Sequence, residues 1–220
     1  MAVTERRQKE MTTAHIYTLS RLVHAGPRSW EQLLASIEEG KSYAFSYYLP
    51  MREAVAHFCA SRGQRRDQIV REMIARARAS GGIRRANRTK DNLDAFETFE
   101  EVFFPEIDRF RKNFLHEKQP GCEFEGLTLQ GAPHFEVVDS DGRKRHVFLH
   151  AAKNWSREDL LAYLELLGIV IEKNYGGDSR SLWVMDLKAG EEIRWRSSAR
   201  VRKNCRAAAR LYGRLISTTI

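Results

Sequence analysis

The sequence predicts an α/β protein with a helical N-terminal region followed by a small mixed sheet flanked by helices. Three observations indicate this class. Apolar residues recur at helical spacing in the first half of the chain, whereas strand-like alternation and glycine-containing turns mark the second half. A strongly helical segment, residues 156–174, lies between two strand pairs. We expect a helical region over residues 1–119 and a sheet region over 120–220, packed together as one unit.

The helices of the first half are predicted from apolar spacing and from capping residues. Ser29 is suited to cap one helix, with Gln32 three positions later, and Pro50 is suited to the first turn of another. Phenylalanines recur at helical spacing between Phe96 and Phe114, and we interpret them as core residues of a long helix or a broken pair. The predicted helices cover residues 11–25, 29–39, a segment that begins at Pro50, 64–80 and 91–114.

Strand signals follow after residue 120. Asp141-Gly142 is typical of a hairpin turn within residues 133–153, and Ala189-Gly190 of a second hairpin within 181–196. Residues 124–130 are predicted as a further strand. Ser156 is expected to cap the intervening helix, and a basic helix over 198–216 closes the chain.

One face of the predicted sheet is expected to pack against the helix of residues 156–174. Apolar residues alternate with polar ones along the strands, and leucines recur at helical spacing in that helix. We place Leu164 near the centre of the contact. The strand residues assigned to it are Val147, Leu149, Trp183, Met185, Leu187, Ile193 and Trp195.

The net charge of +8 is concentrated in two segments. Residues 62–90 hold ten basic and two acidic side chains, and residues 193–220 hold eight basic and no acidic ones. A polyanion such as DNA is therefore the predicted partner, and a merely solvated helical face is the alternative. The candidate nucleic-acid contacts are Arg65, Arg66, Arg84, Arg85, Arg88, Lys90, Arg200, Arg202, Lys203 and Arg206.

Several other classes are excluded by motif and composition. The longest aliphatic stretch, residues 166–171, is far too short for a membrane span, and residues 1–11 lack the apolar region of a secretory signal. We therefore expect a cytoplasmic protein without a membrane partner. Cys59, Cys122 and Cys205 lie far apart and predict neither a disulfide framework nor a zinc site. Phosphate-binding loop, dinucleotide, serine hydrolase and zinc protease motifs are not found.

Residues 131–153, GAPHFEVVDSDGRKRHVFLHAAK, carry a resemblance to a known family. Together with the helix and strand that follow, they resemble the core of the PD-(D/E)XK nuclease superfamily of the RecB type, over about residues 123–215. In that family an aspartate after a proline and a carboxylate two positions before a lysine converge on a metal ion. Here His134 and Ala151 stand at the two carboxylate positions, and Lys153 stands at the lysine position.

The resemblance implies a degenerate active site, because magnesium requires oxygen ligands that His134 and Ala151 do not supply. A rebuilt site would use Glu136, Lys153 and Glu158 as catalytic residues. Glu136 and Glu158 would bind Mg²⁺ in it, with Glu123 or Glu125 as a further carboxylate. A second register would place Asp186 and Lys188 in the motif, with Asp139 or Asp141 as partner. Without a rebuilt site, no cofactor is expected.

Three functions are therefore carried forward. The first is a nucleic-acid-associated protein with a degenerate, inactive nuclease fold that acts in DNA processing or defence. The second is an active metal-dependent nuclease with the rebuilt site. The third is a protein-interaction module without nucleic-acid binding, in which the acidic residues of segment 91–127 pair with a basic partner or with a basic helix of the same chain. Whether the protein is an enzyme is left open by the sequence.

Overall fold

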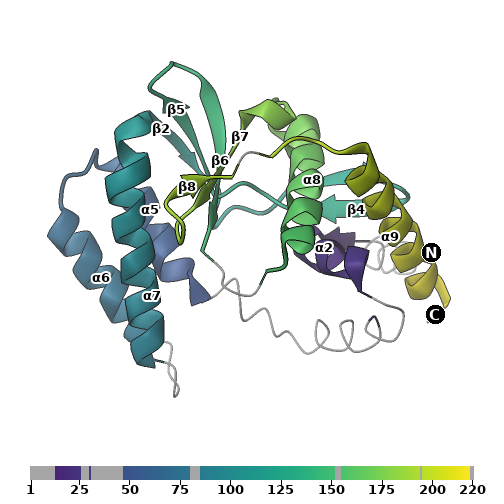
Figure 1. Ribbon diagram of the computed structural model, residues 1–220, viewed down its shortest axis with the longest axis horizontal. Coiled ribbons are helices and arrows are strands. Elements are labelled where there is room, and N and C mark those ends of the chain that lie inside the picture. Colours follow the sequence, from purple (N-terminus) through teal and green to yellow (C-terminus); the bar gives the residue numbers. More distant parts are fainter. Residues whose placement is uncertain are drawn as a thin grey trace, which may run out of the picture.

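The computed structural model describes residues 13–25, 30, 47–79, 85–151, 155–193 and 195–218. It confirms the α/β class and contains two mixed sheets with helices around them (Figure 1). The first half contains β1 (Thr13–His15), α2 (Ile16–His24), α5 (Leu49–Ala60), α6 (Arg66–Ala79), α7 (Arg85–Thr98), η1 (Phe99–Phe103) and η2 (Phe104–Glu106). The second half contains β2 (Ile107–Asn113), β3 (Gly121–Phe124), β4 (Leu127–Gln130), β5 (Phe135–Asp139), β6 (Lys144–His150), α8 (Arg157–Asn174), η3 (Ser179–Ser181), β7 (Leu182–Asp186), β8 (Glu191–Glu192) and α9 (Ala199–Thr218).

The larger sheet has the strand order β2-β5-β6-β7-β8. Strands β5 and β6 form an antiparallel hairpin, and Gly142 in its turn has a φ of 77°, which glycine adopts without strain. Helix α8 then crosses over and returns the chain to β7, which runs parallel to β6. The two predicted hairpins and the crossover helix are thus confirmed.

The smaller sheet has the order β1-β4-β3, and residues 124–130 do not form the single strand predicted. Instead, β3 and β4 form a hairpin whose turn residues, Glu125 and Gly126, have φ values of 52° and 81°. Such left-handed pairs form tight hairpin turns, and the Glu-Gly pair is a weaker signal for them than Asn-Gly. Strand β1 lies within the predicted helix of residues 11–25 and pairs with β4 in parallel, so that helix begins only at Ile16.

Residues 107–113 form the edge strand β2, so the helix predicted to continue to residue 114 is wrong there. The helix ends in a single π turn and a short 3-10 turn, η1 and η2, with Pro105 in η2. Phe110 continued the helical spacing by coincidence, and its ring packs 5.9 Å from that of Phe135 in the neighbouring strand. Charged residues such as Arg109 and Arg111 keep this edge solvated and unsuited to pairing with another chain.

Both faces of the larger sheet are buried, and this reverses one expectation. Five of the seven strand residues assigned to that contact belong instead to the core formed with α5, α6 and α7, namely Val147, Leu149, Trp183, Met185 and Leu187. The other two, Ile193 and Trp195, do pack on the α8 side. Helix α8 packs on the other face, where Phe148 and Val184 lie. Because the strands are apolar on both sides, alternation alone did not identify the face that α8 covers. The leucines of α8 are buried as predicted, with Leu164 at 0% exposure.

Helix α8 is capped at its N-terminus and closely packed along its length. The Ser156 hydroxyl accepts a hydrogen bond from the Asp159 N–H at 3.0 Å, which confirms the predicted cap. A Cβ atom on Gly168 would lie 2.6 Å from the Trp195 ring, so glycine allows this close packing.

Of the helices within the described ranges, none has both the length and the apolar character that a membrane span needs.

A candidate site at one edge of the sheet

Three strands bring polar side chains to one edge of the larger sheet. The beginning of β5 lies near the end of β6, because the two strands are antiparallel, and the parallel strand β7 ends beside them. His134 is held firmly there, since its N–H donates to the Val147 carbonyl at 2.8 Å and its Nδ1 accepts from the Leu149 N–H at 3.0 Å. His150 and Asp186 are register partners at the same edge.

Burial sets the protonation state of the histidines at this edge, and a buried arginine from α5 contributes to it. Arg52 is 7% exposed, and burial lowers the pKa of its guanidinium to about 10. Burial lowers the pKa of His134 well below its usual value, and the charge of Arg52 lowers it further. The pKa of His150 is lowered mainly by burial, and Arg52 and Lys188 act in the same direction while Asp186 opposes them. The edge therefore holds neutral imidazoles beside a fixed positive charge.

The positive charge of Arg52 disfavours the binding of a metal ion at this edge. His134 stands where the resemblance would place a metal-binding aspartate, and the guanidinium close to it would repel a divalent cation. Within the described ranges, no group of three or more histidine, cysteine, aspartate and glutamate side chains is arranged to hold a metal ion.

The residues of the predicted rebuilt site are not joined by any contact in the described part of the chain. Glu136 is nearly buried and is surrounded by cations, with Lys144 Nζ at 2.8 Å and Arg111 Nε at 3.8 Å from its carboxylate. Glu158 is exposed in the first turn of α8. Lys153 lies outside the described residues. The catalytic and metal-binding assignments therefore stay predictions.

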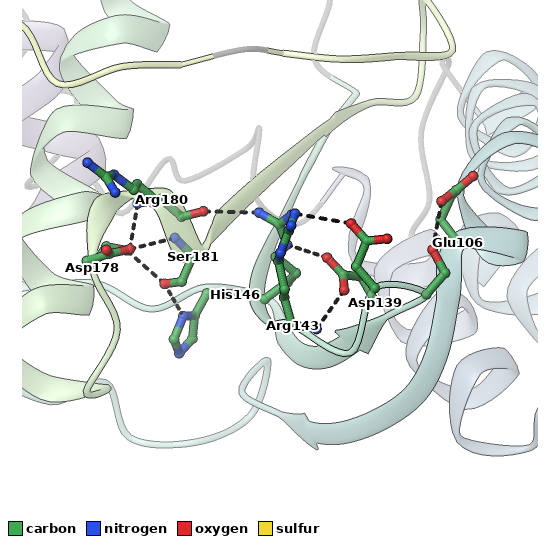
Figure 2. Close-up of polar contacts among 10 residues, drawn as sticks. Glu106, Asp139, Arg143, His146, Asp178, Arg180 and Ser181 are labelled. Carbon is green, nitrogen blue, oxygen red and sulfur yellow. Dashed lines mark hydrogen bonds and ion pairs between the residues drawn. The ribbon is translucent and has the colours of Figure 1, made fainter.

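A second polar cluster, which the sequence did not reveal, lies at the opposite end of β6 (Figure 2). The Ser181 hydroxyl lies 2.9 Å from Nδ1 of His146, and both the Arg180 and Ser181 N–H groups donate to the Asp178 carboxylate. His146 is fully buried, and burial lowers its pKa. These contacts fix the short turn before β7 against β6, so we assign the cluster a structural role.

Several predicted nucleic-acid contacts are engaged within the chain. Arg66 binds the two oxygens of the Glu100 carboxylate through Nε, at 2.7 and 2.8 Å. Arg88 donates to the Tyr47 carbonyl, and its guanidinium lies over the Tyr47 ring. The remaining engaged contacts are Arg85 to the Arg78 carbonyl, Arg202 to Glu165 and Arg206 to Glu125.

Other basic side chains are exposed and have no acidic partner among the described residues. Four of them were predicted contacts, namely Arg65, Lys90, Arg200 and Lys203. Ten more were not singled out from the sequence, namely Arg62, Arg71, Arg78, Arg109, Lys118, Arg157, Lys173, Arg180, Lys188 and Arg196. Arg84 lies outside the described residues. Only the structure separates these two groups, because most of the engaged arginines have partners that lie far away in the sequence.

Comparisons with known proteins do not assign a family. No protein-family model matches the sequence, and neither a curated protein nor a solved structure matches it. The PD-(D/E)XK resemblance, which was drawn from about residues 123–215 of the sequence, therefore stays a prediction.

The buried histidines predict acid sensitivity. In the unfolded chain a histidine takes up a proton near pH 6.5, whereas the folded protein resists this at His134 because its pKa is lowered. Below about pH 6.5 the unfolded state binds more protons, so the free energy of unfolding falls as the pH falls, by up to about 1.4 kcal/mol per pH unit for this group. We expect His134→Asn, which keeps an acceptor for the Leu149 N–H, to flatten this dependence in urea unfolding between about pH 7 and pH 5. Equal slopes in both proteins would contradict this prediction.

Proposed function

We propose that this protein binds nucleic acid, with DNA as the favoured ligand, through exposed cations and without metal-dependent cleavage. The observation that carries the proposal is the surplus of exposed basic side chains on and beside α6, α7 and α9 that have no acidic partner in the described part of the chain. Cations paired with carboxylates contribute little to a polyanion's affinity, whereas unpaired ones neutralise phosphates and release condensed counterions. Binding of this kind is independent of sequence and strongly dependent on salt.

The edge of the larger sheet supports the second half of the proposal. The order β2, β5, β6, α8, β7 is compatible with the core of a PD-(D/E)XK nuclease. At the position of the metal-binding aspartate, however, His134 is occupied by a backbone hydrogen bond and lies beside the Arg52 charge. We therefore propose a degenerate nuclease fold, acting in DNA processing or defence as a binding subunit. We also propose that the protein is cytoplasmic and that it binds a protein partner in a larger assembly.

The salt dependence of DNA binding tests this function. We expect the triple variant Arg71→Ala, Arg78→Ala, Lys90→Ala to bind a labelled duplex more weakly and with a flatter dependence on salt. Each lost phosphate contact lowers the slope of log affinity against log salt by about 0.9. A fluorescence polarisation titration at several salt concentrations measures both quantities.

The matched control is the double variant Arg66→Ala, Glu100→Ala, which removes a paired arginine together with its partner and keeps the net charge. Its affinity and slope should equal those of the wild type. Absence of duplex binding by the wild type would favour the protein-interaction module. Plasmid cleavage in the presence of Mg²⁺, lost on Lys153→Ala, would favour the active nuclease.

A further inference from the structure

We infer that three partly exposed aromatic side chains, Tyr17, His150 and Trp155, form a platform on which an unpaired nucleobase stacks, so that single-stranded nucleic acid binds there. This inference rests on the proposed function and names the form of nucleic acid that this site takes. The three side chains come from separate parts of the chain, namely α2, the end of β6 and the segment just before α8. They meet because α2 packs beside α8 (Figure 1).

Trp155 lies at the centre of the platform. Its ring centroid is 5.6 Å from that of Tyr17 and 6.1 Å from that of His150, with interplanar angles of 55° and 75°. On the inner side, the Tyr163 ring lies 5.1 Å away at 79° and belongs to the buried core. Aromatic rings favour such tilted and edge-on contacts. The indole is therefore held in place by its neighbours without a face-to-face stack on any of them.

The exposure of these rings separates them from ordinary core packing. Within the described ranges, every other aromatic ring contact includes at least one buried ring, whereas the two contacts that Trp155 makes with Tyr17 and His150 join side chains that are all partly exposed. The Trp155 indole N–H and the Tyr17 hydroxyl also have no hydrogen-bond partner in that part of the chain. By contrast, the buried Trp30 donates to the Ala25 carbonyl at 3.0 Å, as tryptophan usually does when it is buried. The polar groups of the platform are left for water or a ligand.

The charges around the platform suit a nucleic-acid strand. Lys188 lies close enough to His150 to lower its pKa, and Arg157 follows Trp155 by two positions at the start of α8. Both cations are exposed, and neither has an acidic partner among the described residues. The one carboxylate near His150 is that of Asp186, which already accepts from two backbone N–H groups of its own turn at 2.9 and 3.2 Å. Cations that can contact phosphates therefore lie next to rings that can stack on a base.

This combination favours a single strand over a duplex. Proteins that bind single strands use cations along the backbone and aromatic side chains on which successive bases stack. In a duplex, each base is already stacked between its neighbours, so its face is not available to a protein ring. A duplex can contact the exposed cations of the protein and leave the platform empty. If the three rings are only the rim of the core, their removal affects both forms of DNA alike.

Fluorescence polarisation with labelled oligothymidine and with a labelled duplex tests the inference on the full-length protein. We expect Trp155→Leu, which keeps an apolar side chain, to bind oligothymidine at least about fivefold more weakly, as for the loss of one stacked base. Its duplex affinity should not change. Its slope of log affinity against log salt should also stay the same, because no cation is removed. Trp155→Phe keeps an aromatic ring and should retain most of the affinity for oligothymidine.

The matched control is Phe110→Leu, which removes a partly exposed ring whose neighbour, Phe135, is buried. Its affinities for both probes should equal those of the wild type. Tyr17→Leu, on a different element, should show the same selective loss as Trp155→Leu, so the test does not depend on the folding of one variant. Circular dichroism establishes that each variant is folded.

Two results would overturn the inference while the proposed function stands. The first is an unchanged affinity of Trp155→Leu and Tyr17→Leu for oligothymidine when the wild type binds DNA. The second is an equal loss of affinity for oligothymidine and for the duplex, or an equal loss in Trp155→Leu and Trp155→Phe, because neither pattern is that of base stacking. If the wild type binds neither probe, the proposed function itself fails.

Discussion

Replacing Arg202 by methionine is expected to destabilise the protein by about 3–5 kcal/mol, the range for breaking a buried ion pair from one side. The Glu165 carboxylate is completely buried in α8, and Arg202 Nε donates to it at 2.5 Å. The Ser197 hydroxyl and the Ser198 N–H also donate to it, at 2.9 and 3.3 Å. Methionine keeps the packing of the arginine stem and removes only the cation, which leaves a buried negative charge uncompensated. Urea unfolding measures the loss.

The matched control for this variant is Arg206→Met on the same helix. Its partner Glu125 is partly exposed and keeps Arg210, so we expect a change of at most about 1 kcal/mol, as for other surface pairs. Adding Glu165→Gln to Arg202→Met should recover part of the lost stability, because a neutral amide costs less to bury than a carboxylate. If Arg202→Met and Arg206→Met cost the same, the buried pair does not hold α9 in place.

Leu164→Ala is expected to cost about 2–5 kcal/mol, the usual range for truncation of a buried leucine. Leu164 is 0% exposed in the core between α8, α2 and the sheet. Leu211→Ala is the matched control, because it makes the same change on a helix at a side chain that is 44% exposed. That substitution should change the free energy of unfolding by no more than about 0.5 kcal/mol. Similar costs for the two variants in urea unfolding would show that α8 is not a core helix.

Local signals predicted much of the fold, and the errors have a common physical origin. Ser156, Gly142 and Gly190 mark a cap and two turns through their own chemistry, so the elements around them were predicted correctly. Strand β2 was mistaken for a helix because its formation depends on pairing with β5, about which the local spacing of phenylalanines says nothing. The face covered by α8 was misassigned for the same reason, since it depends on tertiary packing.

The candidate site was only half visible in the sequence. His134 was found because it stands in a motif position next to Pro133. Arg52 was not singled out, because it lies near the beginning of a largely apolar helix, far from His134 in the sequence, and only tertiary packing brings it to the sheet edge. The separation of engaged from unpaired arginines was hidden in the same way. The sequence shows that a residue is an arginine, and it does not show whether the guanidinium contacts a carboxylate or water.

The pairing of β1 with β4, and of α2 with both α8 and α9, has a consequence for the order of folding. These contacts join segments that are distant in sequence, so the core on the α8 side cannot be completed until α9 has left the ribosome. The three helices α5, α6 and α7 contact one another as near neighbours in the chain and can assemble early. We therefore expect the apolar face of α2 to stay exposed to solvent until α8 and α9 have been synthesised. Aggregation and chaperone binding are expected mainly in that interval.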